Sequence, residues 1–152
     1  MRTHFARLFR ATVWAPEGVP LSAWRFRNIF RVVLPVTDLL FVWFGIVGWI
    51  NGVGSVQDAT GDRWQTWWSI GLAAFALLAF VGIVFPKLWG LELAAKLPLI
   101  GLVSVYVALF LIRGTTEPLV AATAGVIAIL VLLPIWRVAD LSLILGNWRR
   151  SR

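Results

Sequence analysis

Long apolar stretches separated by short polar segments make up most of the chain. Four of them, at residues 32–50, 67–85, 94–112 and 118–136, come close to the ~20 residues that a helix needs to cross the hydrocarbon core of a membrane. The first stretch has an alternative at 39–57, which avoids an internal charge but ends in the poor membrane sequence NGVGSVQ. The pattern predicts an all-α, polytopic membrane protein, with a four-helix transmembrane bundle over residues 32–136.

The two flanking segments, residues 1–31 and 137–152, are predicted to be basic and amphipathic. The spacing of apolar residues from Thr3 to Trp14 predicts a helix that lies in the membrane plane. Its apolar face consists of Phe5, Leu8, Phe9 and Val13. The segment after the fourth span repeats this design, and Pro134 is expected to bend it out of the span. The first arm is interpreted as an anchor that orients the bundle, with a lipid- or partner-sensing role as the alternative.

The composition supports a membrane location. Apolar residues make up 60% of the chain and charged residues 14%, with a mean hydropathy of +0.85, which leaves too little polar surface for a water-soluble enzyme. There is no cysteine and one histidine, so thiol chemistry, disulfides, Cys-ligated metals and multi-histidine metal sites are excluded. No cofactor is expected. The arginine-rich first 31 residues lack the apolar core of a signal peptide.

The distribution of basic residues predicts the orientation. Of the 14 Lys and Arg residues, all but Arg63 and Arg113 precede span one, lie between spans two and three or in the first turn of span three, or follow span four. The positive-inside rule therefore predicts cytoplasmic termini in a bacterial-type cytoplasmic membrane. The net charge of +7 is attributed to this topology and to anionic lipid headgroups rather than to nucleic acid. The residues expected to face lipid headgroups are Arg7, Arg10, Arg149, Arg150 and Arg152.

Small residues predict where helices approach one another closely, because packing of small side chains is a main source of helix association in lipid. They occur at helical spacing in spans one, two and four. The residues singled out are Gly45, Gly48, Gly52, Gly71, Ala74, Ala121 and Gly125. These faces pack either within one bundle or between copies of the chain.

Asp38 is the one acidic residue predicted well inside a span, about 10 Å from its start. An intramembrane carboxylate is costly and normally has a partner. The candidate partners are Lys96 and Arg137, and Glu92 is spaced i, i+4 from Lys96. Two interpretations stay open: a structural ion pair that fixes helix register, and a proton- or cation-binding carboxylate in a transport pathway.

No catalytic motif accompanies these features, so an enzyme is not expected. Four spans with an acidic residue in the first are similar to small multidrug transporters, although here the acid is Asp and lies toward the cytoplasmic end. The small, multi-span, basic-tailed layout resembles that of phage holins, without a shared motif. The leading hypothesis is a non-enzymatic protein that assembles with itself or a membrane partner and is holin-like in its most concrete form. The alternatives are a small transporter or channel subunit using Asp38, and an accessory subunit of a larger membrane complex.

Overall fold

The computed structural model describes residues 11–15, 28–114 and 118–150, with side chains except at residues 55, 113–114, 118–124 and 143–150. This part of the chain is helical and contains no strand. Its elements are the π-helical turn η2 (Ile29–Val33), α2 (Leu34–Asn51), α3 (Gly54–Thr60), α4 (Asp62–Val84), the 3₁₀ turn η3 (Pro86–Leu88), α5 (Trp89–Gly114) and α6 (Pro118–Arg150).

Four of the helical segments are long and apolar enough to cross a membrane. They are η2 with α2, then α4, then η3 with α5, and residues 125–142 of α6. The predicted all-α fold with four transmembrane helices is therefore confirmed, as expected of a small integral membrane protein. Each helix extends beyond its predicted span at one end or both, because the Trp-rich and charged flanks continue the helical geometry at the membrane interface.

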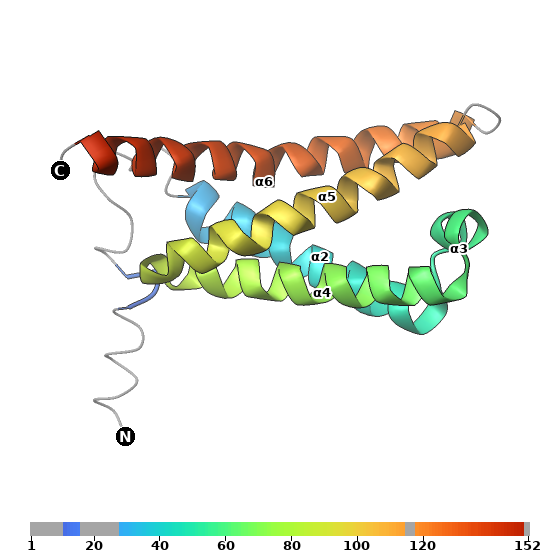
Figure 1. Ribbon diagram of the computed structural model, residues 1–152, viewed down its shortest axis with the longest axis horizontal. Helices are drawn as coiled ribbons and strands as arrows, with labels where there is room; N and C mark the ends of the chain where they lie inside the picture. Colours follow the sequence, from blue (N-terminus) through green and yellow to red (C-terminus); the bar gives the residue numbers. More distant parts are fainter. Residues whose placement is uncertain (1–10, 16–27, 115–117, 151–152) are drawn as a thin grey trace, which may run out of the picture.

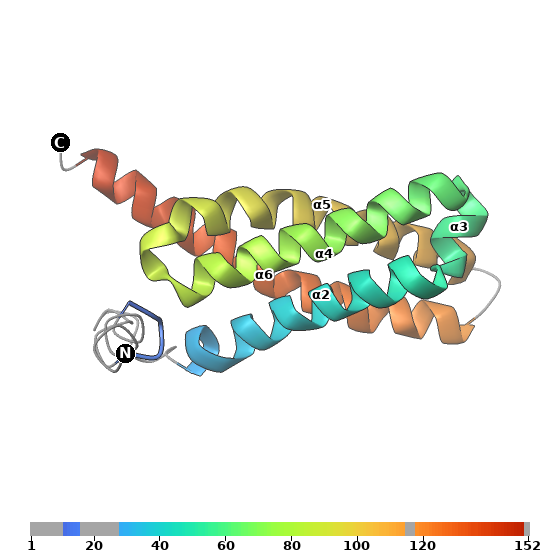
Figure 2. The ribbon, with the colours of Figure 1, turned by 90° about the horizontal axis from the view of Figure 1, so that it is seen from below.

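The helices do not form a symmetric closed bundle. Helices α2 and α4 lie side by side, and α5 crosses from α4 at one end to α6 at the other (Figures 1 and 2). Helix α6 packs along α5 and has only a small contact with α2. The apolar core between α2, α4 and α5 includes the fully buried Leu72, Ala76, Ala79 and Leu99.

An aromatic group fills the space where α5 diverges from α4, near α3. The ring of Tyr106 stacks on Trp68 with centroids 5.4 Å apart and contacts Phe44 and Phe110 edge-on or tilted. The indole Nε1 of Trp68 donates a hydrogen bond of 3.0 Å to the carbonyl oxygen of Leu102. This bond satisfies the polar atom of a ring that is otherwise buried among apolar side chains.

The N-terminal segment differs from the amphipathic helix expected over Thr3 to Trp14. Residues 1–10 lie outside the described part of the chain, and residues 11–15 form turns and a bend rather than a helix. Two local causes are visible. The backbone N–H of Val13 bonds to the carbonyl of Val84 at the end of α4, and Ala15 precedes a proline, which disfavours helical backbone there.

Helix α6 continues through Pro134 to Arg150, so the backbones of the fourth span and of the predicted tail from residue 137 are joined in one helix. A proline is tolerated inside a membrane helix when its neighbours and local adjustments satisfy the freed carbonyl. At 1.5 Å per residue, the 33 residues of α6 span about 50 Å, longer than the hydrocarbon core, so the helix extends past the membrane-spanning part of the bundle.

Candidate functional site: a buried ladder of charged side chains

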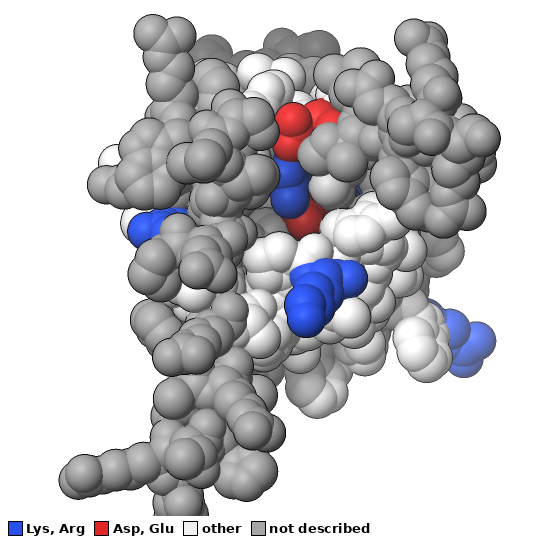
Figure 3. All heavy atoms as spheres, turned by 90° about the vertical axis from the view of Figure 1, so that its left-hand side faces the viewer, with Lys and Arg blue, Asp and Glu red and all other residues white. Residues whose placement is uncertain are grey.

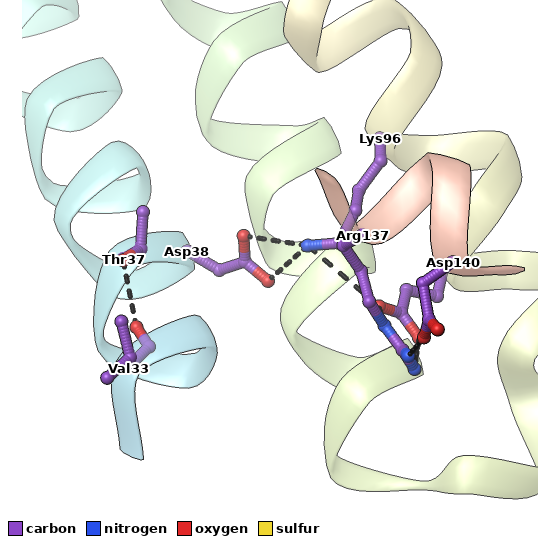
Figure 4. Close-up of polar contacts among 7 residues, drawn as sticks. Val33, Thr37, Asp38, Lys96, Arg137 and Asp140 are labelled. Carbon is purple, nitrogen blue, oxygen red and sulfur yellow. Dashed lines mark hydrogen bonds and ion pairs between the residues drawn. The ribbon is translucent and has the colours of Figure 1, made fainter. Parts of the chain in front are cut away.

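The centre of the site is an ion pair between α2 and α5. The Nζ atom of Lys96 lies 3.2 Å from both carboxylate oxygens of Asp38 (Figure 4). The side chain of Lys96 has no exposed area and that of Asp38 is 2% exposed. Such a pair persists in an apolar interior because each charge compensates the other, and an isolated ion there would be far more costly.

Further charges continue from this pair toward the surface of the bundle. Lys96 Nζ lies 4.0 Å from Oε1 of Glu92, one turn earlier on α5. The guanidinium of Arg137 on α6 donates to both oxygens of Glu92, at 2.7 and 3.0 Å, and to Asp140 at 2.8 Å. We call these five side chains the charge ladder: Asp38, Lys96, Glu92, Arg137 and Asp140.

Exposure rises along the ladder from its inner to its outer end. The side chains of Asp38, Lys96 and Glu92 are at most 2% exposed, whereas those of Arg137 and Asp140 are 13% and 35% exposed. The inner four ionised groups have no net charge, and Asp140 adds one negative charge near the surface. Acidic and basic side chains are visible together in a recess when the molecule is viewed from the end at which α2 begins (Figure 3). We call this the charged end of the bundle.

The start of α2 is shaped to present Asp38. Pro35 has no N–H to donate, and the N–H of Leu34 bonds five residues back to Ile29, which produces the π-helical turn η2. The hydroxyl of Thr37 donates to the carbonyl of Val33 at 2.8 Å, so this polar side chain is satisfied within its own helix. Because its hydroxyl is bonded to Val33, Thr37 does not compete with Lys96 for the carboxylate of Asp38, which points toward α5.

A glycine on α4 allows Glu92 to occupy its position. A Cβ atom added to Gly82 would lie 2.6 Å from Cβ of Glu92 and 2.7 Å from its backbone nitrogen and Cα. These distances are far below van der Waals contact, so α4 and the first turn of α5 can meet here only at a glycine. The acidic side chain also lies in the first turn of its helix, where the helix dipole favours negative charge.

Arg137 also contacts the π-helical turn, where α2 and α6 come together. Its guanidinium carbon lies 4.7 Å from the ring centroid of Phe30, a cation–π geometry. The ring of Phe30 is in turn 6.0 Å from that of Trp136. One arginine therefore connects α6 with both α2 and α5.

A second buried polar group lies toward the opposite end of α2. The amide nitrogen of Gln65 on α4 donates to the carbonyl of Gly48 at 2.6 Å and to Oγ of Ser69 at 3.0 Å. This group was not predicted from the sequence, although a Gln and a Ser spaced i, i+4 at the start of an apolar helix are the signal that could have indicated it.

Apolar side chains separate these two polar groups. Asp38 and Gly48 are ten residues apart on α2, about 15 Å along the helix. Buried side chains at this level include Phe41, Leu72 and Ala76. Among the described residues, the charge ladder therefore ends inside the bundle and does not continue as a polar path to the other side.

The small residues predicted to pack have different positions. Gly45 and Gly48 lie against α4, where an added Cβ would be 2.6 Å from the backbone nitrogen of Ala73 and 2.9 Å from Oγ of Ser69, respectively. Gly52, with φ of +77°, ends α2 rather than packing a helix against it. Gly45 and Gly48, three residues apart, thus pack within the bundle.

The remaining small residues are less enclosed. An added Cβ at Gly71 would make ordinary contact with Leu102 at 3.5 Å, Ala74 is exposed, and Gly125 faces open space. Residue Ala121 lies in α6, but its side chain is outside the described part of the structure. The same holds for the side chains of the basic residues expected to face lipid headgroups, Arg7, Arg10, Arg149, Arg150 and Arg152.

The structure thus brings together all four of the charged residues named from the sequence. Lys96 pairs with Asp38 and adjoins Glu92, while Arg137 binds Glu92 and not Asp38 directly. No group of three or more potential metal-ligating side chains occurs in the described part of the chain. Comparison with protein families, with curated proteins and with solved structures finds no match.

Proposed function

We propose that this small integral membrane protein is not an enzyme and acts by assembling with further copies of itself in a cytoplasmic membrane. Its termini and charged end face the cytoplasm in this proposal, as the distribution of Lys and Arg favours. Membrane perturbation of the holin type is the most concrete form of this activity. Such a protein needs no reactive group, and the charged side chains of the ladder bind one another.

The observation that carries the proposal is a row of exposed residues along α5. It consists of Leu97, Gly101, Ser104, Ala108 and Leu111, spaced four, three, four and three residues apart. Small residues thus occupy the middle of the row, and an added Cβ at Gly101 would meet nothing within 4 Å. Small side chains at this spacing allow two helix backbones to approach closely in lipid.

The exposed face of α2 provides the contrast. Its outward residues are large, and they include Val36, Leu39, Trp43 and Ile46. Bulky side chains of this kind keep a neighbouring helix at a distance, whereas the small side chains of Gly101, Ser104 and Ala108 permit a second α5 helix to approach more closely. A symmetric dimer through α5 would pair this row with itself.

The test is to measure oligomeric state in lipid nanodiscs for Gly101→Leu and for the matched control Gly125→Leu. Both glycines are exposed helix positions with open space around an added Cβ. We expect Gly101→Leu to shift the protein toward monomers and Gly125→Leu to leave the distribution unchanged. Monomeric parent protein, or equal effects of the two substitutions, would contradict assembly through α5.

Leakage from liposomes containing the parent protein tests what the assembly does. Release of large dyes supports the holin-like activity, and Gly101→Leu should reduce that release together with oligomer formation. An oligomer that releases neither dyes nor ions would instead support an accessory subunit of a larger membrane complex.

A second candidate is a small ion- or proton-coupled transporter or channel subunit that uses Asp38. The ladder from the partly exposed Asp140 to the buried Asp38 favours it, and the apolar layer beyond Asp38 argues against it. Flux of protons or small ions without dye release, abolished by Asp38→Asn in a variant that still folds, would favour this candidate over the first.

A further inference from the structure

A short non-helical segment, residues 11–15, lies against the charged end of the bundle, and we call it the strap. It donates one backbone and one side-chain hydrogen bond, to α4 and to η2. The N–H of Val13 donates to the carbonyl of Val84 at 2.9 Å, at the end of α4. The indole of Trp14 donates to the carbonyl of Arg31 at 2.9 Å, in the turn that precedes α2.

Arg31 is the main polar attachment of the strap. Its Nε donates to the carbonyl of Val13 at 3.1 Å and its Nη2 to that of Ala15 at 2.7 Å. One side chain thus binds two carbonyls of the strap. Within the strap, the N–H of Ala15 donates to the carbonyl of Thr12, which closes a turn. Removing this guanidinium takes away two charge-assisted hydrogen bonds at once.

The strap also has an apolar contact that leads to the charge ladder. Val13 is 4% exposed and packs in a cluster with Phe30, Leu34 and Ile83. The ring of Phe30 also lies beneath the guanidinium of Arg137, at 4.7 Å from its carbon to the ring centroid. The ring of Phe30 therefore belongs to the apolar cluster of the strap and also contacts Arg137 of the charge ladder.

We infer that the strap is a releasable closure of the charged end, coupled to the charge ladder through Phe30. When seated, it covers the apolar cluster around Phe30 and holds the ring against Arg137. When released, it uncovers this cluster and loosens the outer half of the ladder. This inference is independent of the proposed self-assembly, since no residue of the α5 row takes part in it.

Cysteine labelling tests the closure, because the native chain has no cysteine. The reporter is Val13→Cys, a buried position, and the reference for reagent access is Lys87→Cys, an exposed position in η3 at the same end. A membrane-permeant maleimide is applied to the full chain in nanodiscs. We expect the reporter to react much more slowly than the reference.

Arg31→Gln is then introduced beside the reporter, with Arg63→Gln at the opposite end of the bundle as the matched control. We expect Arg31→Gln to raise the labelling rate of the reporter by about tenfold or more, because two hydrogen bonds from a charged donor are lost. Arg63→Gln should leave the rate unchanged. A reporter that labels as fast as the reference in the parent chain, or equally slowly with and without Arg31, overturns the closure.

The coupling to the ladder is tested with Arg137→Lys in the same reporter background. Lysine keeps the positive charge beside Glu92 but loses the flat guanidinium over Phe30. We expect labelling of the reporter to rise by roughly two- to tenfold, the range that a cation–π contact represents. An unchanged rate overturns the coupling between strap and ladder.

Discussion

Replacing Lys96 with methionine is expected to destabilise the bundle by about 3–5 kcal/mol, the usual cost of leaving one member of a buried ion pair without its partner. The magnitude follows from the geometry. At 3.2 Å and an effective dielectric constant of ~20, the attraction between Lys96 and Asp38 is about 5 kcal/mol. Methionine has nearly the same volume as lysine, so the loss is electrostatic rather than a packing defect.

The double variant Asp38→Leu with Lys96→Met provides the control. Removing both charges leaves no uncompensated ion, and exchanging a buried pair for apolar residues is often neutral or stabilising. We therefore expect the double variant to be more stable than Lys96→Met alone by at least about 2 kcal/mol. Asp38→Leu alone should be destabilising, because Lys96 then keeps only the more distant Glu92, at 4.0 Å.

The assay is reversible unfolding of the four proteins in the same lipid or detergent environment, analysed as a double-mutant cycle. Because Glu92 also faces Lys96, a residual effect in the double variant reports on that second contact. Single variants that each cost less than about 1 kcal/mol, or effects that simply add, would refute the ion pair as a stabilising contact between α2 and α5.

Two further predictions concern packing and orientation. Gly82→Ala should cost about 1–3 kcal/mol in the same unfolding assay, because its Cβ would overlap the backbone of Glu92, whereas Gly90→Ala, with open space, should change stability by less than about 0.5 kcal/mol. In intact cells, an impermeant thiol reagent should label Asp58→Cys, between α2 and α4, but not Arg150→Cys, if the termini are cytoplasmic; the reverse pattern would invert the orientation.

The four spans and the ion pair between Asp38 and Lys96 could be predicted from the sequence, because both follow from the need to satisfy polar groups inside the lipid. Stretches of about 20 apolar residues can hardly avoid forming helices in lipid, since every backbone polar group must be satisfied locally. A lone carboxylate in such a stretch requires a cation, and few lie at a similar depth. Lys96 was therefore among the candidate partners of Asp38 before any geometry was known.

The i, i+4 spacing of Glu92 and Lys96 was also visible in the sequence, whereas the contacts between helices depend on tertiary geometry that helical spacing cannot give. The bond between Arg137 and Glu92 joins residues 45 positions apart and depends on how far α6 is shifted along α5. The faces of Gly45 and Gly48 were recognised as packing surfaces, but spacing alone could not show that α4 occupies them. The turn at residues 11–15 had the apolar pattern of a helix, and hydrogen bonds to Val84 of α4 and to the side chain of Arg31 in η2 overrode it.

The charge ladder lies where the contacts between helices are weakest. In lipid there is little hydrophobic driving force between apolar helices, so contacts between them depend on close packing and on polar interactions. Helices α2 and α4 meet closely at Gly45 and Gly48, but α6 lies against α5 and barely contacts α2. Arg137 reaches Phe30 of η2 across this junction and also binds Glu92 of α5. The charge ladder therefore ties α6 to both of its neighbours at this end of the bundle.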